Sequence, residues 1–252
     1  MVSKNQEKLI NSLSMKKYRD KTGLFLAEGP KLFSDLTESG LKPHLIIADK
    51  SWQPPHEYSF DTEHIIVNEN ELKKLSLQKT PQNIIAIFHQ PQRFYQNNFS
   101  DSILLGLDGI QDPGNFGTIL RIADWFGFND IVCSIDTVDL YNPKVVQASM
   151  GSIARVNVQY VNFEEFCANY IASGNMIYGT FLNGENIYST TIQNGLIVFG
   201  NEGNGIRPEI ENKISKRITI PAFSTNKLTS ESLNVSIAAA IVCSEFKRKS
   251  II

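Results

Sequence analysis

Short apolar runs recur along most of this 252-residue chain, and segments with helical spacing separate them. Runs of about four to eight apolar residues bounded by turn residues are typical of buried strands. Strands that alternate with helices favour a mostly parallel sheet with helices on both faces, because each parallel connection needs a crossover. The chain is therefore predicted to have an α/β fold. The expected strands span residues 23–27, 44–48, 63–67, 83–88, 102–108, 130–135, 176–182, 195–200 and 217–221.

The alternation is interrupted at residues 89–100, HQPQRFYQNNFS, which lose periodicity and gather Gln, Asn and Pro. Such a stretch is typical of a linker between two cores. The sequence therefore predicts a small α/β domain over residues 1–95 and a larger domain over residues 100–252. In the small domain, Pro30 suits the start of a helix and Gly40 its end.

The composition argues against several classes of protein. Cys133, Cys167 and Cys243 lie far apart with no C-x-x-C pair, so we expect neither a disulfide framework nor a metal site. They suit buried positions in a reduced, cytoplasmic protein. No run of 18 apolar residues occurs, and no long apolar stretch follows the first lysine. We therefore expect neither export nor a membrane-spanning helix.

The charge is distributed unevenly, although the net value is only −2. Residues 1–31 carry seven Lys/Arg against three Asp/Glu, and residues 207–252 carry eight against four, which leaves −10 for the middle. Such ends suit contact with a phosphate backbone, but solvated helix faces would give the same pattern. Arg19, Lys21 and Lys31 are candidate phosphate contacts, with ordinary surface charge as the alternative.

Three loops after expected strands carry unusual residues, and in open α/β sheets ligands bind at such places. In the first loop, within residues 104–128, a strand runs into glycines and then a helix. Asn115 suits either a cap or turn role at the start of this helix or a functional one. Arg121 projects away from the expected buried face, where it is available for a partner or for a surface salt bridge. That buried face consists of Phe116, Ile119, Leu120 and Ala123.

The second loop, within residues 195–210, contains Gly200, Gly203 and Gly205. These glycines allow positive φ or the close approach of a ligand, but G-x-x-G-x-G is not the dinucleotide fingerprint G-x-G-x-x-G. Glu202 lies among them and could pair with an arginine, contact a substrate hydroxyl or cap the next helix.

The third loop follows a strand that ends at Pro221 and precedes a long Ala- and Ile-rich helix. We expect that helix to open at Ser232-Leu233-Asn234, with Ser232 as its N-cap.

The three loops, taken in order, resemble the signature motifs of the SpoU/TrmH family within the SPOUT methyltransferases. The matches are N-x-G-x-x-x-R-x-A at 115–123, F-G-N-E-G-x-G at 199–205 and I-P…S-L-N-V-S at 220–236. NPKVVQASMGSI at 142–153 is similar to a further family segment. The resemblance covers roughly residues 100–248. YRDKTGLFLAEGPKLF and LSLQKTPQNIIAIF also resemble the family's RNA substrate-binding domain, a small α/β fold related to certain ribosomal proteins.

The resemblance implies an enzyme that transfers a methyl group from S-adenosyl-L-methionine to a ribose 2′-hydroxyl of structured RNA, with ribosomal RNA favoured over transfer RNA. It implies a C-terminal trefoil knot, and a homodimer whose donor pocket lies beside the interface. The donor contacts that it implies are Thr180, Gly200, Ile220 and Leu233, with Gly203 and Gly205 shaping the pocket.

Arg121 matches the arginine that activates the 2′-hydroxyl in this family. Because an arginine resists deprotonation, we expect it to stabilise the developing alkoxide, while Ser232, Glu202 or a water accepts the proton. The resemblance further implies that Asn115, Glu202, Ser232 and Asn234 orient ribose and phosphate.

Two alternatives of other classes are an RNA-binding or ribosome-assembly factor without turnover, and a nicotinamide-dependent oxidoreductase. The intact Arg121 and Glu202 argue against the first, and the glycine spacing argues against the second. One departure from the family is the loop AFSTNKLTSE at 222–231, which has ten residues where many relatives have about six. No motif residue is lost through it.

Overall fold

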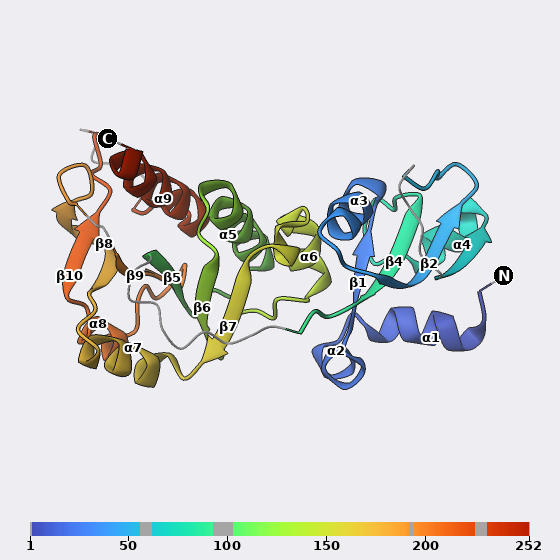
Figure 1. Ribbon diagram of the computed structural model, residues 1–252, viewed down its shortest axis with the longest axis horizontal. Helices are drawn as coiled ribbons and strands as arrows, with labels where there is room; N and C mark the ends of the chain where they lie inside the picture. Colours follow the sequence, from blue (N-terminus) through green and yellow to red (C-terminus); the bar gives the residue numbers. More distant parts are fainter. Residues whose placement is uncertain (1, 56–61, 93–102, 192–193, 225–230, 252) are drawn as a thin grey trace. The chain divides into compact units, whose positions relative to one another are not determined.

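The structure is a computed structural model in which two compact units are distinguished (Figure 1). Unit 1 comprises Met1–Arg93 with Asp139–Arg155, and unit 2 comprises Phe94–Val138 with Val156–Ile252. The residues that the structure describes are 2–55, 62–92, 103–191, 194–224 and 231–251. The expected linker at 89–100 lies mostly outside them, so a domain boundary there stays a prediction.

Unit 1 is built on a four-stranded mixed sheet in the order β1-β4-β2-β3. β4 is antiparallel to β1 and β2, and β2 is parallel to β3. The strands are β1 (Leu24–Glu28), β2 (Pro43–Asp49), β3 (Glu63–Val67) and β4 (Ile84–His89). The helices are α1 (Lys4–Ser12), α2 (Lys16–Thr22), α3 (Pro30–Glu38), α4 (Glu69–Leu75) and α6 (Pro143–Ser149), with a 3₁₀ turn at Ser152–Ala154. All four expected strands are confirmed, and α3 begins at the predicted proline.

Arg19 is buried within unit 1 and does not face solvent. Its side chain is 2% exposed, and Nε and Nη2 donate to the Asp139 carboxylate at 3.0 and 2.6 Å. Nη1 donates to the carbonyl of Leu13 at 2.8 Å. A buried guanidinium requires such partners, because an unpaired charge there would be costly. The prediction that Arg19 contacts phosphate is therefore wrong, whereas Lys21 and Lys31 are exposed.

Unit 2 contains a six-stranded, entirely parallel sheet in the order β10-β8-β9-β5-β6-β7. The strands are β5 (Ile103–Asp108), β6 (Asp130–Ser134), β7 (Asn157–Val161), β8 (Ile177–Asn186), β9 (Gly195–Gly200) and β10 (Lys216–Thr219). Figure 1 shows α5 (Pro113–Phe126) and α9 (Val235–Ile251) on one face of this sheet, and α7 (Phe163–Ala172) and α8 (Pro208–Glu211) on the other. The predicted parallel sheet with helices on both faces is confirmed.

β5 and β9 are neighbours in this sheet, and their register pairs Asp108 with Gly200. Because the strands are parallel, the loops that follow them emerge side by side at the carboxyl edge. Between these strands and α7 lies a core that includes Leu104, Leu196 and Phe163. The fold thus brings together two loops that are about ninety residues apart in the sequence.

The three cysteines are buried and free. Burial raises the pKa of the Cys167 and Cys243 thiols to about 12, which keeps them protonated and unreactive. In the described part of the chain, no group of three or more His, Cys, Asp or Glu side chains could hold a metal ion. No helix in the same residues has the length and hydropathy to cross a membrane.

The expected trefoil knot depends on the path between β10 and α9. Residues 225–230 of that connection fall outside the described ranges, together with most of the long loop at 222–231. The knot and the effect of the longer loop therefore stay predictions.

Candidate active site

The turn after β5 positions the start of α5. Gly109 adopts a φ of +71°, which favours glycine, and the chain then reaches Asp112. Asp112 is the N-cap of α5, and its side chain accepts a hydrogen bond of 2.7 Å from the backbone N–H of Asn115. Asn115 is therefore not the cap that sequence reasoning allowed. Its side chain is left for other bonds.

The Asn115 amide joins all three signature motifs. Its Nδ2 donates to Glu202 Oε1 at 2.8 Å, and its Oδ1 accepts from Asn234 Nδ2 at 2.9 Å. A carboxylate only accepts hydrogen bonds, so this network determines which terminal atom of each amide is the oxygen and which is the nitrogen. Side chains separated by 87 and 119 residues thus form one cluster.

Asn234 caps the long helix α9. Its Oδ1 accepts from the backbone N–H of Ser236 and of Ile237, at 3.0 and 3.4 Å, and from Ser236 Oγ at 2.6 Å. The expected N-cap, Ser232, lies two residues before this position and is exposed, so that prediction is wrong. Ser236 is 6% exposed and extends the cluster. The motif S-L-N-V-S contained it, but sequence reasoning assigned it no role.

The glycines after β9 form a tight turn. Asn201 and Gly205 exchange two backbone hydrogen bonds of 3.0 and 2.9 Å, and Gly205 has a φ of +71°. A Cβ on Gly200 would overlap the backbone of Gly205 and Ile206, whereas a Cβ on Gly203 would meet only Asn201 Oδ1, at 3.5 Å. A glycine is therefore required at position 200, where two backbone segments approach closely, but not at position 203.

Asn201 ties this turn to the one after β5, a role that sequence reasoning missed. Its Nδ2 donates to the carbonyl of Gly109 at 2.7 Å, and its Oδ1 accepts from the N–H of Gly203 at 2.9 Å and of Asn204 at 3.1 Å. The two loops that carry Asn115 and Glu202 are therefore held in fixed register.

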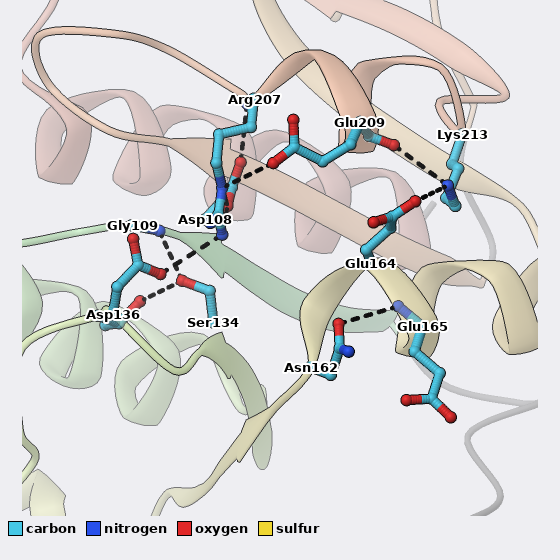
Figure 2. Close-up of polar contacts among 11 residues, drawn as sticks. Asp108, Gly109, Ser134, Asp136, Asn162, Glu164, Glu165, Arg207, Glu209 and Lys213 are labelled. Atoms are coloured by element: carbon cyan, nitrogen blue, oxygen red, sulfur yellow. Dashed lines mark hydrogen bonds and ion pairs between the residues drawn. The ribbon is translucent and has the colours of Figure 1, made fainter.

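Asp108 and Arg207 make a second tie between the same loops, shown in Figure 2. Asp108 is fully buried, and its carboxylate accepts the backbone N–H of Arg207 at 2.8 Å and Arg207 Nε at 2.7 Å. Arg207 Nη2 also contacts Asp108 and reaches Asp136 at 3.4 Å. The hydrogen bonds to Asp108 raise the pKa of Arg207. Sequence reasoning missed both residues, although a buried strand that ends in Asp was a usable signal.

Arg121 lies on the exposed side of α5. The predicted buried face of Phe116, Ile119, Leu120 and Ala123 is confirmed. The side chain of Arg121 is exposed and makes no hydrogen bond or ion pair with any residue that the structure describes. The alternative of a surface salt bridge therefore finds no support in this part of the chain. On the same helix, Trp125 is 84% exposed.

Three of the four expected donor contacts lie in or directly after adjacent strands, and the fourth lies just before α9. Thr180 lies in β8, where its Oγ1 donates to the carbonyl of Val198 at 3.0 Å. Gly200 ends β9, Ile220 directly follows β10, and Leu233 is 50% exposed just before α9. Because β10, β8 and β9 are consecutive in a parallel sheet, Gly200 and Ile220 lie at one carboxyl edge.

Comparison with known proteins gives two family matches. The profile of the SpoU rRNA Methylase family matches residues 102–244, and that of the MRM3-like substrate binding domain matches residues 4–86. The chain is 30% identical to the 23S rRNA (guanosine(2553)-2′-O)-methyltransferase RlmP of Bacillus subtilis, over 95% of each protein. It is also 30% identical to the mitochondrial rRNA methyltransferase 3 of Xenopus laevis, over 69% of this chain and 44% of that protein.

Solved structures agree in fold over the whole chain. A protein of Porphyromonas gingivalis assigned to the TrmH family of RNA methyltransferases has a TM-score of 0.86 and 38% identity, and the alignment covers 99% of each chain. An AdoMet-bound rRNA methyltransferase of Sinorhizobium meliloti has a TM-score of 0.82 and 26% identity, with coverage of 100% of this chain and 98% of that one. The three motifs, their hydrogen-bonded cluster and these matches lead to one conclusion: the chain belongs to the SpoU rRNA methylase family.

Proposed function

We propose that this protein transfers a methyl group from S-adenosyl-L-methionine to a ribose 2′-hydroxyl of ribosomal RNA. The observation that carries the proposal is the Asn115 amide, which joins Glu202 and Asn234, together with an exposed Arg121 on the same helix as Asn115. The relatives named above support the reaction, since RlmP is a 23S rRNA 2′-O-methyltransferase by name. The 2′-hydroxyl is itself what distinguishes RNA from DNA, so the substrate class follows from the reaction.

The loop Gly200–Gly205 fits the methyl donor. Gly205 has no side chain, and no other atom lies within 4 Å of its Cβ position, so a ligand can approach the turn closely there. Thr180, Ile220 and Leu233 add partly buried or exposed side chains that suit the remaining contacts. When bound, S-adenosyl-L-methionine supplies an electrophilic methyl group. We assign Gly203 only a supporting role.

Arg121 stabilises negative charge that develops on the 2′-oxygen. Arginine side chains resist deprotonation in proteins, so we assign Arg121 the role of a hydrogen-bond donor and not that of the base. Preorganised donors of this kind contribute about 10²- to 10³-fold to turnover. No described residue engages Arg121, which leaves all its donors for the substrate.

We assign the proton acceptor to Glu202. Only its Oε1 is engaged, by Asn115, and Oε2 makes no hydrogen bond to the described residues. Asn115 and Asn234 then hold this carboxylate in place, and Ser232 contributes to the orientation of ribose and phosphate.

The protein acts as a homodimer in which the exposed sides of α5 and α9 meet. Trp125 on α5 is 84% exposed, and Ile237 on α9 is 51% exposed, so a second protomer would cover large apolar side chains on both helices. Arg121 shares the exposed side of α5, so dimerisation would place it beside the partner's donor site. We place the dimer in the cytoplasm, where free thiols stay reduced.

The test is transfer of labelled methyl groups to ribosomal RNA from a strain that lacks the gene. We expect 2′-O-methylated ribose with the native protein and a loss of about 10²- to 10³-fold in kcat with Arg121→Ala, while donor binding measured by calorimetry is retained. Arg121→Lys should recover only part of the rate, because a single ammonium replaces the guanidinium fork. Donor binding without transfer to any RNA would instead favour an assembly factor.

The dimer has its own test. Mixing Arg121→Ala protein with Gly200→Ala protein should restore activity if each site uses Arg121 of one protomer and the donor loop of the other. Sedimentation should give twice the monomer mass. A monomer with full activity would exclude this arrangement.

A further inference from the structure

The positive charge of unit 1 is concentrated on its first two helices. Residues 4–22 carry six Lys/Arg against two Asp/Glu, whereas residues 23–93 carry seven against nine. Within the first segment, Arg19 is buried against Asp139, and Lys16 pairs with Asp20 at 2.9 Å. In the described part of the chain no ion pair involves Lys4, Lys8 or Lys21. These three ammonium groups are therefore open to an external anion.

α1 and α2 enclose an open groove, called here the α1–α2 groove, of about 680 Å³. Its lining combines the three lysines and one carboxylate, that of Glu7, with the apolar and aromatic side chains of Leu9, Met15 and Tyr18. Met15 is 47% exposed, and Lys17 Nζ lies 4.9 Å from the centre of the Tyr18 ring. Cationic groups next to an aromatic ring and a thioether suit a ligand that has both phosphates and flat bases.

The apolar side of α1 is already used within unit 1. Ile10 and Leu13 are fully buried in the core that also contains Leu26 and Ile47. A helix whose apolar face is buried in its own domain cannot insert that face into a lipid surface. The charge of the groove therefore favours a nucleic acid over a membrane.

We propose that the α1–α2 groove binds a single-stranded segment of the RNA substrate. Lys4, Lys8 and Lys21 contact its phosphates, and one base packs against Tyr18 and Met15. The proposal rests on the proposed function, because it takes RNA as the substrate. In this proposal the exposed lysines of the basic N-terminal segment contact the RNA. Arg19 does not, because it is buried and paired with Asp139 within unit 1.

The experiment measures binding of an unmodified 23S ribosomal RNA transcript to the full-length protein over a range of salt concentrations. The groove variant is Lys4→Gln/Lys8→Gln/Lys21→Gln, and the matched control is Lys42→Gln/Lys50→Gln/Lys79→Gln, which removes the same charge from exposed lysines of the same unit. Each lost phosphate contact lowers the slope of log affinity against log salt by roughly 0.7 to 0.9. The slope measured for the groove variant should therefore be smaller in magnitude than the native slope by about 2 to 3.

A rise from about 50 to about 200 mM salt weakens RNA binding by both proteins. The factor by which the affinity falls should be roughly 20- to 40-fold smaller for the groove variant than for the native protein. The control triple variant should keep the native slope, and a triple Lys→Arg variant of the groove should restore it. Tyr18→Leu should lower affinity roughly 5-fold or more with the slope unchanged, because stacking does not depend on salt. At saturating RNA the groove variant should keep its kcat and show a raised KM.

Equal slope changes in the groove and control variants would overturn the proposal, because the effect would then be one of overall charge. So would a native slope in the groove variant, or a groove variant whose only loss is binding to vesicles of anionic lipid. These results leave the proposed reaction intact if the native protein still methylates RNA. Failure of the native protein to methylate would count against the reaction alone, since slopes are measured by binding.

Discussion

Loss of the Arg207 side chain should destabilise unit 2 far more than loss of an ordinary surface ion pair. The partner of Arg207 is the carboxylate of Asp108, which is fully buried at the end of β5. In Arg207→Ala that carboxylate keeps the backbone N–H of residue 207 but loses its side-chain donors. Leaving a buried charge without its partner costs about 3–5 kcal/mol.

The Arg207 side chain is 38% exposed, so water can enter the space that it leaves and screen the charge. We therefore expect the lower part of the range, about 2–3 kcal/mol. For a chain of this length each kcal/mol lowers Tm by roughly 2–4 °C, which gives a decrease of about 4–12 °C. Calorimetry of the full-length protein measures this change.

The matched control is Lys213→Ala. Lys213 pairs with Glu164 at 2.9 Å, near Arg207 in Figure 2, but the Glu164 side chain is 55% exposed. Breaking this pair should cost no more than about 1 kcal/mol. Asp108→Asn should also destabilise, because its new NH₂ group would face donors of Arg207. The double variant should show a coupling energy of about 1–3 kcal/mol. An Arg207→Ala cost no greater than that of Lys213→Ala would refute this reasoning.

Three further predictions concern other contacts. Gly200→Ala should abolish donor binding in calorimetry, because the new Cβ would overlap the backbone of Gly205 and Ile206. Gly203→Ala should bind the donor with native affinity. Equal donor affinities in the two variants would contradict the loop geometry. Arg19→Ala should lower the stability of unit 1 by about 3–5 kcal/mol in denaturant unfolding, because Asp139 loses its charged partner. A cost below about 1 kcal/mol would exclude a buried pair. Burial raises the pKa of Glu28 above 4.5, so its contribution to stability is present below pH 4.5 and is lost as pH rises through the folded pKa. Glu28→Gln should therefore flatten that pH dependence; an unchanged pH profile would count against the shift.

Sequence periodicity predicted most of the fold because most elements are strongly patterned. All nine expected strands occur, and boundaries shift by a few residues at most except in β8, which runs on to Asn186. β7 was missed because NVQYV has polar residues within an edge strand. The placement of residues 139–155 in unit 1 was also not predicted, since it depends on contacts such as Arg19 with Asp139.

Sequence motifs indicated members of the hydrogen-bonded cluster but not their connections, and the roles of these residues stay predictions. Motif positions indicated Asn115, Glu202 and Asn234, and the structure joins them by hydrogen bonds. The cap roles were wrong because Asp112 and Asn234 lie only three and two residues from the competing cap candidates, and local propensity does not choose between such neighbours. Pairings across about ninety residues leave no local pattern, so they require the fold.

The polar groups of the site fall into two sets, and the division supports the assigned roles. Asn115 and Asn234 are engaged at both ends of their amides, so they are held in place before any substrate binds. Arg121 and Glu202 Oε2 have no partner among the described residues, so they are the groups with capacity for a ligand. Both residues are exposed to solvent. Covering Arg121 with RNA or a second protomer would exclude solvent from it, and its attraction for a developing alkoxide would then be strongest. We therefore expect transfer to depend on assembly of the covered site, and a protomer with Arg121 left in solvent to bind the donor without turning it over.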